Sequence, residues 1–388
     1  MRLKLVKFRK SFSCDVLIFD HIGASWLSKL VPNSARIGYV STRFSFPILF
    51  DKYFLQRLFV ILLRHIFSRN YDSYYFYLDT LIKSINPKII VTAADNSVTL
   101  SKVTKLHSSI LFLYVQSALR DLYSFQRSLD LPVYCSFGNI EKRLFSDLNV
   151  RVQEYLPIGS VKLGMAMSEG HTTSYEHVDI CFISTYRAEK RYSKNRDVWI
   201  IRRIKDIEQL LFLHSIKFAR QSNLSVRVLG KAREDEWQRL ELIHYEKLAD
   251  GFPFEYVRTD NELGEYESYY GLLSSGLSIN CGSTLGFEGL SAGKKVLFGA
   301  TMDVKFIDDW GVGFYYLDIP QLISLQQESF EHFSCKVKHL RNIALDDFLK
   351  ITSPYARQIM SESSIGKPHE LLQQKIEHHL SQSTNLDS

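Results

Sequence analysis

One stretch, residues 277–300, constrains the possible fold more than any other, and it reads LSINCGSTLGFEGLSAGKKVLFGA. The apolar run 277–281 predicts a strand, the small residues 282–284 predict a tight turn, and the residues from there to 290 predict a helix. A glycine then ends the helix, and residues 295–298 predict a second strand. A strand, a helix and a strand joined by short turns are typical of α/β proteins with a parallel sheet.

The turn before this helix carries chemistry suited to a nucleotide. Backbone N–H groups at a helix start are unpaired and carry partial positive charge, so Gly282, Ser283 and Thr284 form a natural seat for phosphate. Glu288 follows one helical turn beyond Thr284, where its carboxylate can accept hydrogen bonds from ribose hydroxyls. The alternative is an ordinary capped helix, because Ser before a helix and Glu in its first turn are both common.

Length and composition limit the classes of protein to consider. A chain of 388 residues favours two domains of ordinary size. Its 45% hydrophobic and 13% aromatic residues are enough for packed cores and exclude wholesale disorder. The net charge of +6 is spread along the chain, and no nucleic-acid motif is visible. We therefore expect an anionic ligand or a membrane surface as partner, and no nucleic acid.

Cysteines and apolar segments bear on the compartment. The five cysteines are widely spaced with no C-x-x-C pair, which favours core residues in a reducing, cytoplasmic environment. The N-terminus lacks an uninterrupted apolar region with a cleavage site, so no signal peptide is expected. Residues 53–67 are apolar but include Arg57, Arg64 and His65, and they are shorter than the roughly 20 residues of a membrane span. We expect a buried helix there, with a helix lying in a membrane interface as the alternative.

Polar residues follow three of the strands predicted in the first half, 15–19, 88–92 and 109–115. In an open parallel sheet the carboxyl ends of the strands bind ligands, so these residues are candidates for a site. In chain order they are Asp20, His21, Asp95, Asn96, Gln116 and Arg120. Asp95 also fits an ordinary turn or helix-capping role.

A second alternating series begins at residue 178. Arg187 follows its strand 178–184 and Lys231 follows 225–229, so both are candidates to neutralise phosphate, or else are ordinary solvated loop residues. We expect an N-terminal Rossmann-like domain over 1–160, a linker over 161–177, a nucleotide-binding Rossmann-like domain over 178–350, and C-terminal helices and a tail over 351–388.

Two sets of residues resemble a known family. Ser283, Thr284 and Glu288, followed by AGKKVL at 292–297, resemble the donor-nucleotide segment of GT-B glycosyltransferases. The further motifs are PKIIVT (87–92), DNS (95–97), VQ (115–116), Arg120, FG (137–138), EK (141–142), GS (159–160) and DICFIS (179–184). Together they resemble bacterial surface-carbohydrate biosynthesis proteins of the GT-B type. Ser117-Ala118 replaces the Asn-Gly pair expected after Gln116, which puts acceptor choice and activity in question.

The resemblance implies two Rossmann-like domains facing across a cleft, with a C-terminal helix crossing back to the first domain. It also implies a sugar transfer from a nucleotide sugar to a hydroxyl of a surface glycan or lipid-linked glycan, as in capsule or lipopolysaccharide synthesis. The donor carries a hexose or a CMP-linked acidic sugar. Such a protein works in the cytoplasm, where the inner face of the membrane is a candidate docking surface.

The expected roles of the residues follow from this reaction. Gly282, Ser283, Thr284, Glu288, Arg187 and Lys231 are assigned to the donor, and Asn96, Gln116 and Arg120 to the acceptor side. Removing a proton from the acceptor hydroxyl needs a carboxylate or an imidazole, so Asp95 is the first candidate base, and Asp20 or His21 the second. No Asp-x-Asp or H-E-x-x-H motif is present, so we expect no metal and no cofactor besides the nucleotide sugar.

Three alternatives stay open at this point. A CDP-polyol phosphotransferase of the teichoic-acid type has a similar fold and would transfer phosphate together with its polyol. A non-catalytic GT-B-like protein would bind nucleotide without turnover. A sugar-nucleotide epimerase of the same fold would need no acceptor.

Overall fold

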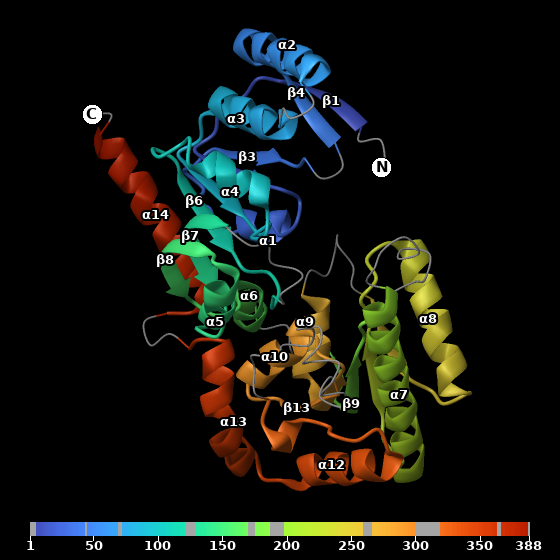
Figure 1. Cartoon of the computed structure of the whole chain (residues 1–388). Helices are drawn as coiled ribbons and strands as arrows, with labels where there is room; N and C mark the ends of the chain where they lie inside the picture. Colours follow the sequence, from blue (N-terminus) through green and yellow to red (C-terminus); the bar gives the residue numbers. More distant parts are fainter. Residues whose placement is uncertain are drawn as a thin grey trace.

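Two open parallel sheets form the framework of the protein (Figure 1). The structure is a computed structural model that describes residues 5–42, 45–68, 72–120, 129–169, 175–186, 198–258, 266–299, 319–362 and 366–386. The first sheet has six strands in the order β3-β2-β5-β6-β7-β8. These strands are β2 (Val16–Phe19), β3 (Ile37–Val40), β5 (Ile89–Thr92), β6 (Leu111–Val115), β7 (Asp130–Ser136) and β8 (Arg151–Pro157).

Helices cover both faces of the first sheet. Successive side chains of a strand point to opposite faces, and apolar side chains lie on each face of this sheet. One core joins strand residues such as Leu17 and Ile90 to α3 (Ser73–Ile85), α4 (Val98–Thr104) and α5 (Glu141–Leu148). The other core joins strand residues such as Val16 and Val91 to α1 (Ala24–Ser28), α6 (Val161–Glu169) and α14 (Pro368–Leu386).

The second sheet has five strands in the order β11-β10-β9-β12-β13. They are β9 (Val178–Ile183), β10 (Val226–Leu229), β11 (Glu255–Val257), β12 (Ser275–Asn280) and β13 (Lys295–Phe298). The elements around it are α7 (Val198–Ser222), α8 (Asp235–Ala249), α9 (Glu267–Leu273), α10 (Thr284–Ser291), the short η5 (Gln321–Ile323), α12 (Phe330–Asn342) and α13 (Leu345–Ile359). Both expected Rossmann-like units are therefore present, and the predicted α/β class is confirmed.

Strand order places a crevice in each sheet. In the first sheet the chain reverses direction between β2 and β5, and in the second between β9 and β12. The loops at the carboxyl ends of such a strand pair leave in opposite directions, which opens a ligand crevice between them. Asp20 follows β2 and Asp95 follows β5, while Ser184 follows β9 and Gly282 follows β12.

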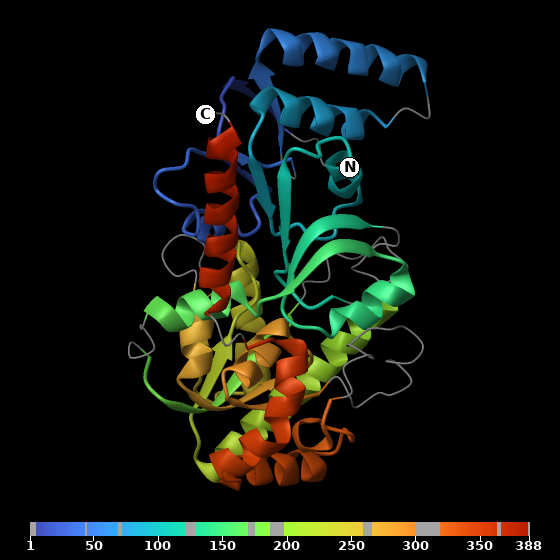
Figure 2. The ribbon, with the colours of Figure 1, turned by 90° about the vertical axis from the view of Figure 1, so that its left-hand side faces the viewer.

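The C-terminal segment crosses back to the first half, as the resemblance implied. The backbone N–H groups of Asn139 and Ile140 donate to the carbonyl of Gln358 at the end of α13. Farther on, Lys375 of α14 forms an ion pair with Glu154 of β8 at 2.7 Å. Figure 2 shows α14 (red) running alongside the first sheet.

Three local expectations differ from the structure. Helix α2 (Lys52–Phe67) was expected to be buried, but only Phe54 and Ile61 on it are buried, because it packs through one narrow stripe. Strands β1 (Leu5–Lys10) and β4 (Ser45–Phe50) pair in parallel beside α2 and were not predicted. The segment 161–177, expected as a weakly periodic linker, begins with the packed helix α6.

The structure offers no helix, among the residues it describes, with the length and apolar character needed to cross a membrane.

Candidate functional site

The turn between β12 and α10 has the local structure that the sequence predicts. Ser283 is the N-cap residue of α10, and its hydroxyl accepts a hydrogen bond from the backbone N–H of Leu285 at 3.3 Å. The side-chain oxygen of Asn280 accepts from the N–H of Ser283 at 2.9 Å and so holds the turn in place. A Cβ on Gly286 would lie 2.5 Å from Nδ2 of Asn280, so a larger residue at this position would displace the side chain that holds the turn. That buried Nδ2 atom has no hydrogen-bond partner within the described part of the chain.

Thr284 connects this turn to the first half of the molecule. Its hydroxyl oxygen accepts a hydrogen bond from the backbone N–H of Leu119 at 3.0 Å. Leu119 lies in the loop after β6, at the carboxyl edge of the first sheet. The carboxyl edges of both sheets therefore meet at the start of α10, where a donor and an acceptor can be brought together.

Glu288 lies farther along α10 and is only 4% exposed. Ser160 of the first half donates a hydrogen bond to its carboxylate, and the hydroxyl of Tyr269 donates a second at 2.9 Å. Burial raises the pKa of Glu288, while the two hydrogen bonds and the charge of Lys162 act to lower it. The carboxylate assigned to the ribose thus bridges the two halves here, and a ribose would have to replace Ser160.

Asp95 is fully buried beneath the crevice of the first sheet. Arg120 forms a two-point ion pair with its carboxylate, and the hydroxyl of Tyr134 donates to it at 3.0 Å. Burial raises the pKa of Asp95, and Arg120 opposes this rise. Its role as general base stays a prediction, and it would require Arg120 to move aside.

Asp20 and His21 form a more open pair at the end of β2. Oδ1 of Asp20 accepts the backbone N–H of His21 at 2.6 Å and lies 2.7 Å from Nδ1 of the imidazole. The left-handed backbone of Asp20, with φ of 72°, allows this close arrangement. The His21 side chain is 41% exposed, and its contact with Asp20 orients the imidazole.

On the acceptor side, Gln116 is held within the protein. Its amide group donates to Glu141 at 2.5 Å, and its oxygen accepts from the N–H of Phe137 at 2.7 Å. Burial raises the pKa of Glu141 to about 7. Gln116 therefore ties the loop after β6 to the β7–α5 connection at this edge of the sheet, while Asn96 is half-buried in the turn after β5.

Two buried carboxylates at the edge of the second sheet were not predicted. Glu241 of α8 accepts from the backbone N–H groups of Lys231 at 2.9 Å and Ala232 at 2.8 Å. Glu208 of α7 accepts from the backbone N–H of Thr185 at 3.1 Å. They anchor the loop after β9, which flanks the second crevice, and the loop after the neighbouring strand β10.

These two carboxylates are linked by the hydroxyls of Ser184 and Tyr245. Burial raises the pKa of Glu208 to about 7, and the negative charge of Glu241 acts in the same direction. Nothing in the sequence marked these residues, since each is one polar position in a long helix. By contrast, Ser160 stands in the Gly159-Ser160 motif, which offered a signal.

The structure describes one of the two residues predicted to neutralise phosphate. Lys231 lies in the loop after β10 with an exposed side chain. Arg187 lies outside the described residues. Across the described part of the chain, no group of three or more His, Cys, Asp and Glu side chains could hold a metal ion.

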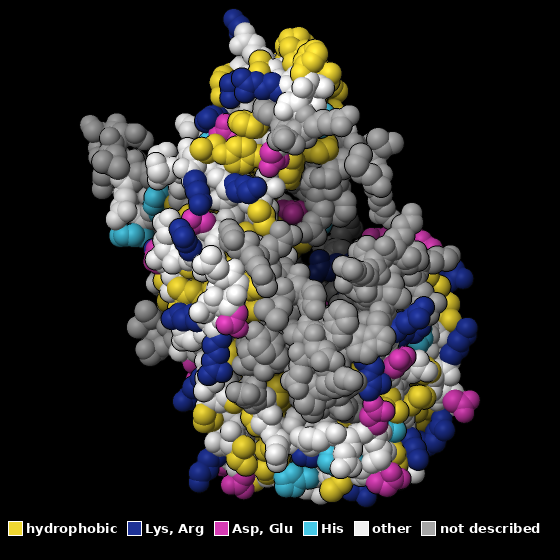
Figure 3. Space-filling model, in the orientation of Figure 1, with side chains coloured by type: hydrophobic (Ala, Val, Ile, Leu, Met, Phe, Trp, Pro, Cys, Tyr) yellow, Lys and Arg dark blue, Asp and Glu magenta, His cyan; other side chains and the backbone are white. Residues whose placement is uncertain are grey.

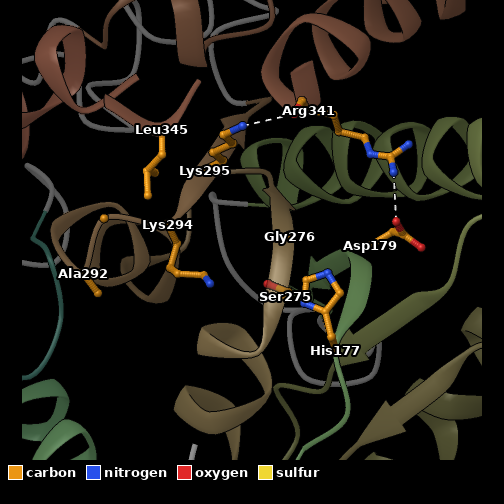
Figure 4. Close-up of a pocket in the computed structure, with 10 residues that line it drawn as sticks. His177, Asp179, Ser275, Gly276, Ala292, Lys294, Lys295, Arg341 and Leu345 are labelled. Carbon is orange, nitrogen blue, oxygen red and sulfur yellow. Dashed lines mark hydrogen bonds and ion pairs between the residues drawn. The ribbon is translucent and has the colours of Figure 1, made fainter. Parts of the chain in front are cut away.

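A pocket of about 580 Å³ lies at the opposite edge of the second sheet. It is lined by the amino ends of β9, β12 and β13, with Lys294 and His177 at its wall (Figure 4). Arg341 forms an ion pair there with Asp179 at 2.9 Å. Because ligands of open α/β sheets bind at the carboxyl ends of the strands, we assign the site to the crevices and not to this pocket.

Solved structures with the same architecture come from carbohydrate-related proteins. The wall teichoic acid polymerase TagF is 10% identical, with a TM-score of 0.52, and the match covers 95% of this chain and 90% of that chain. A "putative UDP-N-acetylglucosamine 2-epimerase" from Listeria monocytogenes is 12% identical, with a TM-score of 0.51 and coverage of 96% and 98%. At these identities the likeness establishes the fold alone. No curated protein sequence matches the chain.

A protein family also matches the sequence. The family is described as "putative O-antigen biosynthesis protein", and the match spans residues 147–355, more than half of the chain. It covers the strands of the second sheet, the turn before α10 and both buried carboxylates of α7 and α8. The chain therefore belongs to this family of O-antigen biosynthesis proteins and has the GT-B type of fold found in surface-carbohydrate synthesis.

Proposed function

We propose that this protein is a metal-independent glycosyltransferase of surface-polysaccharide synthesis. It transfers a sugar from a nucleotide-sugar donor to a hydroxyl of a surface glycan or lipid-linked glycan, of the kind built into lipopolysaccharide or capsule. The hydrogen bond between Thr284 and Leu119 carries this proposal, because it brings the phosphate-suited turn of one sheet against the ligand edge of the other.

In this proposal the donor lies over the second crevice. The start of α10, with Gly282, Ser283 and Thr284, accepts the phosphates, and the charge of Lys231 or Arg187 stabilises the departing nucleotide. Glu288 binds the ribose hydroxyls after it releases Ser160. The loop after β9, held by Glu208, borders the same crevice, and the loop after β10, held by Glu241, lies next to it.

The acceptor enters from the first crevice. Asn96, Gln116 and Arg120 shape that side, and the base is Asp95 or the pair formed by Asp20 and His21. If Asp95 acts, Arg120 must move toward the donor phosphates, which offer it a competing negative partner. If the pair acts, the exposed imidazole of His21 takes the proton, and Asp20 stabilises the imidazolium that forms.

Nucleotide binding provides the first test. Purified protein is melted with CMP, CDP, UDP, GDP or ADP, each with and without magnesium. A nucleotide at about 100 times its Kd adds ~2.7 kcal/mol of stability, which gives a clear shift in Tm. We expect one nucleotide to shift the Tm without magnesium, and no shift with any of the five would contradict the proposal.

A matched pair of variants distinguishes nucleotide binding at Ser283 from the role of Ser283 as a helix N-cap. Ser283→Ala removes an N-cap at the proposed phosphate seat, whereas Ser329→Ala removes the N-cap of α12, which accepts from His332 at 3.2 Å. Both variants lose about 1 kcal/mol of helix stabilisation. Only Ser283→Ala should also lose the nucleotide-induced shift.

A teichoic-acid type CDP-polyol phosphotransferase is the second candidate function. The observation in its favour is the fold-level likeness to TagF over 95% of this chain. Product mass distinguishes the two, because a phosphotransferase adds phosphate with a polyol whereas a glycosyltransferase adds only the sugar. Conversion of a nucleotide sugar without any acceptor would indicate an epimerase, and binding without any product would indicate a non-catalytic protein.

The proposed acceptor also suggests a place of action. A lipid-linked glycan is presented at a membrane, so we place the reaction at the cytoplasmic surface of the inner membrane. The enzyme would attach there as a peripheral protein.

A further inference from the structure

The outer face of α2 is apolar and exposed. Two stripes with helical spacing run along this helix. Phe54, Leu58 and Ile61 form the inner stripe, which packs on the rest of the first half. The outer stripe contains Phe59 and Ile66, which are 62% and 73% exposed. A surface helix of a soluble domain normally has polar residues on that face, whereas the outer side of α2 leaves large apolar side chains uncovered by the part of the chain that the structure describes.

The apolar surface continues onto the neighbouring strands. Phe8 of β1 and Phe50 of β4 are 62% and 61% exposed, and their rings stack with centroids 5.5 Å apart. We call the whole set the apolar cap. It comprises Val6, Phe8, Phe50, Tyr53, Leu55, Phe59, Val60, Leu62, Leu63, Ile66 and Phe67. Figure 3 shows hydrophobic side chains (yellow) gathered at the end of the molecule that carries α2.

Positive charge surrounds the apolar cap. Arg57 and Arg64 are seven residues apart and so lie on one side of α2. Exposed Lys7, Arg9 and Lys10 of β1 and exposed Lys52 add to this charge. In residues 5–10 and 45–68 the sole acidic residue is Asp51, whose carboxylate caps α2 by accepting from Tyr53 at 2.6 Å.

The apolar cap and the positive charge around it together indicate which kind of partner covers this surface. An apolar centre bordered by Lys and Arg fits the interface of a bilayer that contains anionic lipids, because acyl chains take the apolar side chains and headgroups pair with the cations. A second copy of the chain would bring two positively charged rims together, which repel one another. Charge complementarity therefore favours a lipid surface over self-association.

We propose that the apolar cap seats this protein in the interface of an anionic bilayer. The α2 face and the first crevice lie in the same half of the molecule. Thr42, which follows β3, forms a hydrogen bond of 2.6 Å with Tyr74 of α3, the helix on which α2 packs, and the neighbouring Ser41 lies 3.5 Å from Asp20. Docking at α2 would therefore place the half of the molecule that carries the acceptor side against the membrane. This inference rests on the proposed function only for the lipid-linked nature of the acceptor.

Vesicle sedimentation of the full chain tests this inference. The probes are vesicles of phosphatidylcholine alone and vesicles with about one-third phosphatidylglycerol, at low and at high salt. We expect binding to the anionic vesicles that weakens with salt, because exposed charges are screened. The apolar variant Phe59→Ser with Ile66→Ser should reduce partitioning at least tenfold. The charge variant Arg57→Glu with Lys52→Glu should do the same at low salt.

Matched variants on the opposite half control for general effects. Leu240→Ser with Ile351→Ser also removes two exposed apolar side chains, and Lys338→Glu with Lys350→Glu also reverses two exposed charges. Both controls should bind vesicles like the unaltered protein. Equal binding by the α2 variants, or no binding by the unaltered protein at low salt, would overturn the proposal. So would a dimer that dissociates in Phe59→Ser with Ile66→Ser and does not bind vesicles.

Nucleotide-induced Tm shifts in the same variants keep this proposal separate from the function. We expect the α2 variants to retain the shift, because α2 lies apart from both crevices. Vesicle binding without any nucleotide-induced Tm shift would support the membrane-binding proposal and contradict the transferase proposal. A nucleotide shift without vesicle binding would retain the transferase and reject the membrane surface.

Discussion

Ser160 donates a hydrogen bond to the carboxylate of Glu288, and these two residues are 128 positions apart in the chain. Ser160 precedes α6 beside the first sheet, whereas Glu288 lies on α10 of the second. The residue assigned to the donor ribose is therefore a bridge between the two halves. If Glu288 binds the ribose as proposed, donor binding and separation of this bridge are coupled, since a ribose hydroxyl competes for the same carboxylate.

Ser160→Ala should strengthen nucleotide binding and weaken the fold. Loss of a donor to a buried carboxylate costs about 1–3 kcal/mol, measured as the free energy of unfolding in urea. The nucleotide no longer has to displace Ser160, so its Kd measured by calorimetry should fall. Tyr269→Phe is the control, because it removes the other hydrogen bond to Glu288 and leaves the Ser160 hydroxyl in place. An unchanged or higher Kd in Ser160→Ala would contradict the coupling.

Asp95→Asn should lower turnover by about 10²–10⁴ if Asp95 is the base, because an amide cannot take the acceptor proton. The change also removes the charge partner of Arg120, so the free energy of unfolding should fall by about 3–5 kcal/mol. A preserved nucleotide-induced Tm shift would show that the variant still folds. Tyr134→Phe, which keeps the ion pair, should retain most of the activity. Normal turnover in Asp95→Asn would exclude Asp95 as the base, and His21→Ala would then test the second candidate.

Stability should depend on pH through Glu208. Burial raises the pKa of this carboxyl from its ordinary 4.5 to about 7, so between these values the folded state binds more protons than the unfolded state. The free energy of unfolding should therefore decrease as pH rises from about 4.5 to 7, and then level off. Each unit of pKa difference corresponds to on the order of 1 kcal/mol.

Urea unfolding between pH 4.5 and 8 measures this effect. Glu208→Gln stays neutral and should show a smaller decrease, while the remainder comes from the other buried carboxyls whose pKa is raised, Glu141, Asp95 and Glu288. Exposed Glu246→Gln is the control. An unaltered pH profile in Glu208→Gln would exclude this carboxyl as the source.

Gly138→Ala should separate the C-terminal segment from the first half. A Cβ on Gly138 would lie 2.4 Å from the backbone oxygens of Gln358 and Ile359, and backbone atoms cannot give way cheaply. We expect a loss of about 3 kcal/mol in the free energy of unfolding. Gly366→Ala is the matched control, because its Cβ would meet only ordinary contacts of 3.4 Å or more. Equal stability of both variants would show that the crossover tolerates movement.

The sequence by itself determined the elements that depend on local pattern. Apolar runs of four to seven residues, separated by segments with helical spacing, identified strands of both parallel sheets, namely β2, β5, β6, β9, β10, β12 and β13. The small residues before α10 identified its N-cap at Ser283, because capping involves only neighbouring backbone groups. Resemblance supplied the GT-B pairing of the two sheets and the crossing of the C-terminal helix.

Only the tertiary structure decided which of these elements meet. Periodicity defines the faces of a helix but does not say whether protein or another medium covers them, so α2 was expected to be buried and is exposed. The bonds of Asp95 to Arg120 and of Glu288 to Ser160 depend on how loops and sheets pack. Glu208 and Glu241 were overlooked for the same reason. Their role comes from distant backbone N–H groups, and no spacing along α7 or α8 encodes those contacts.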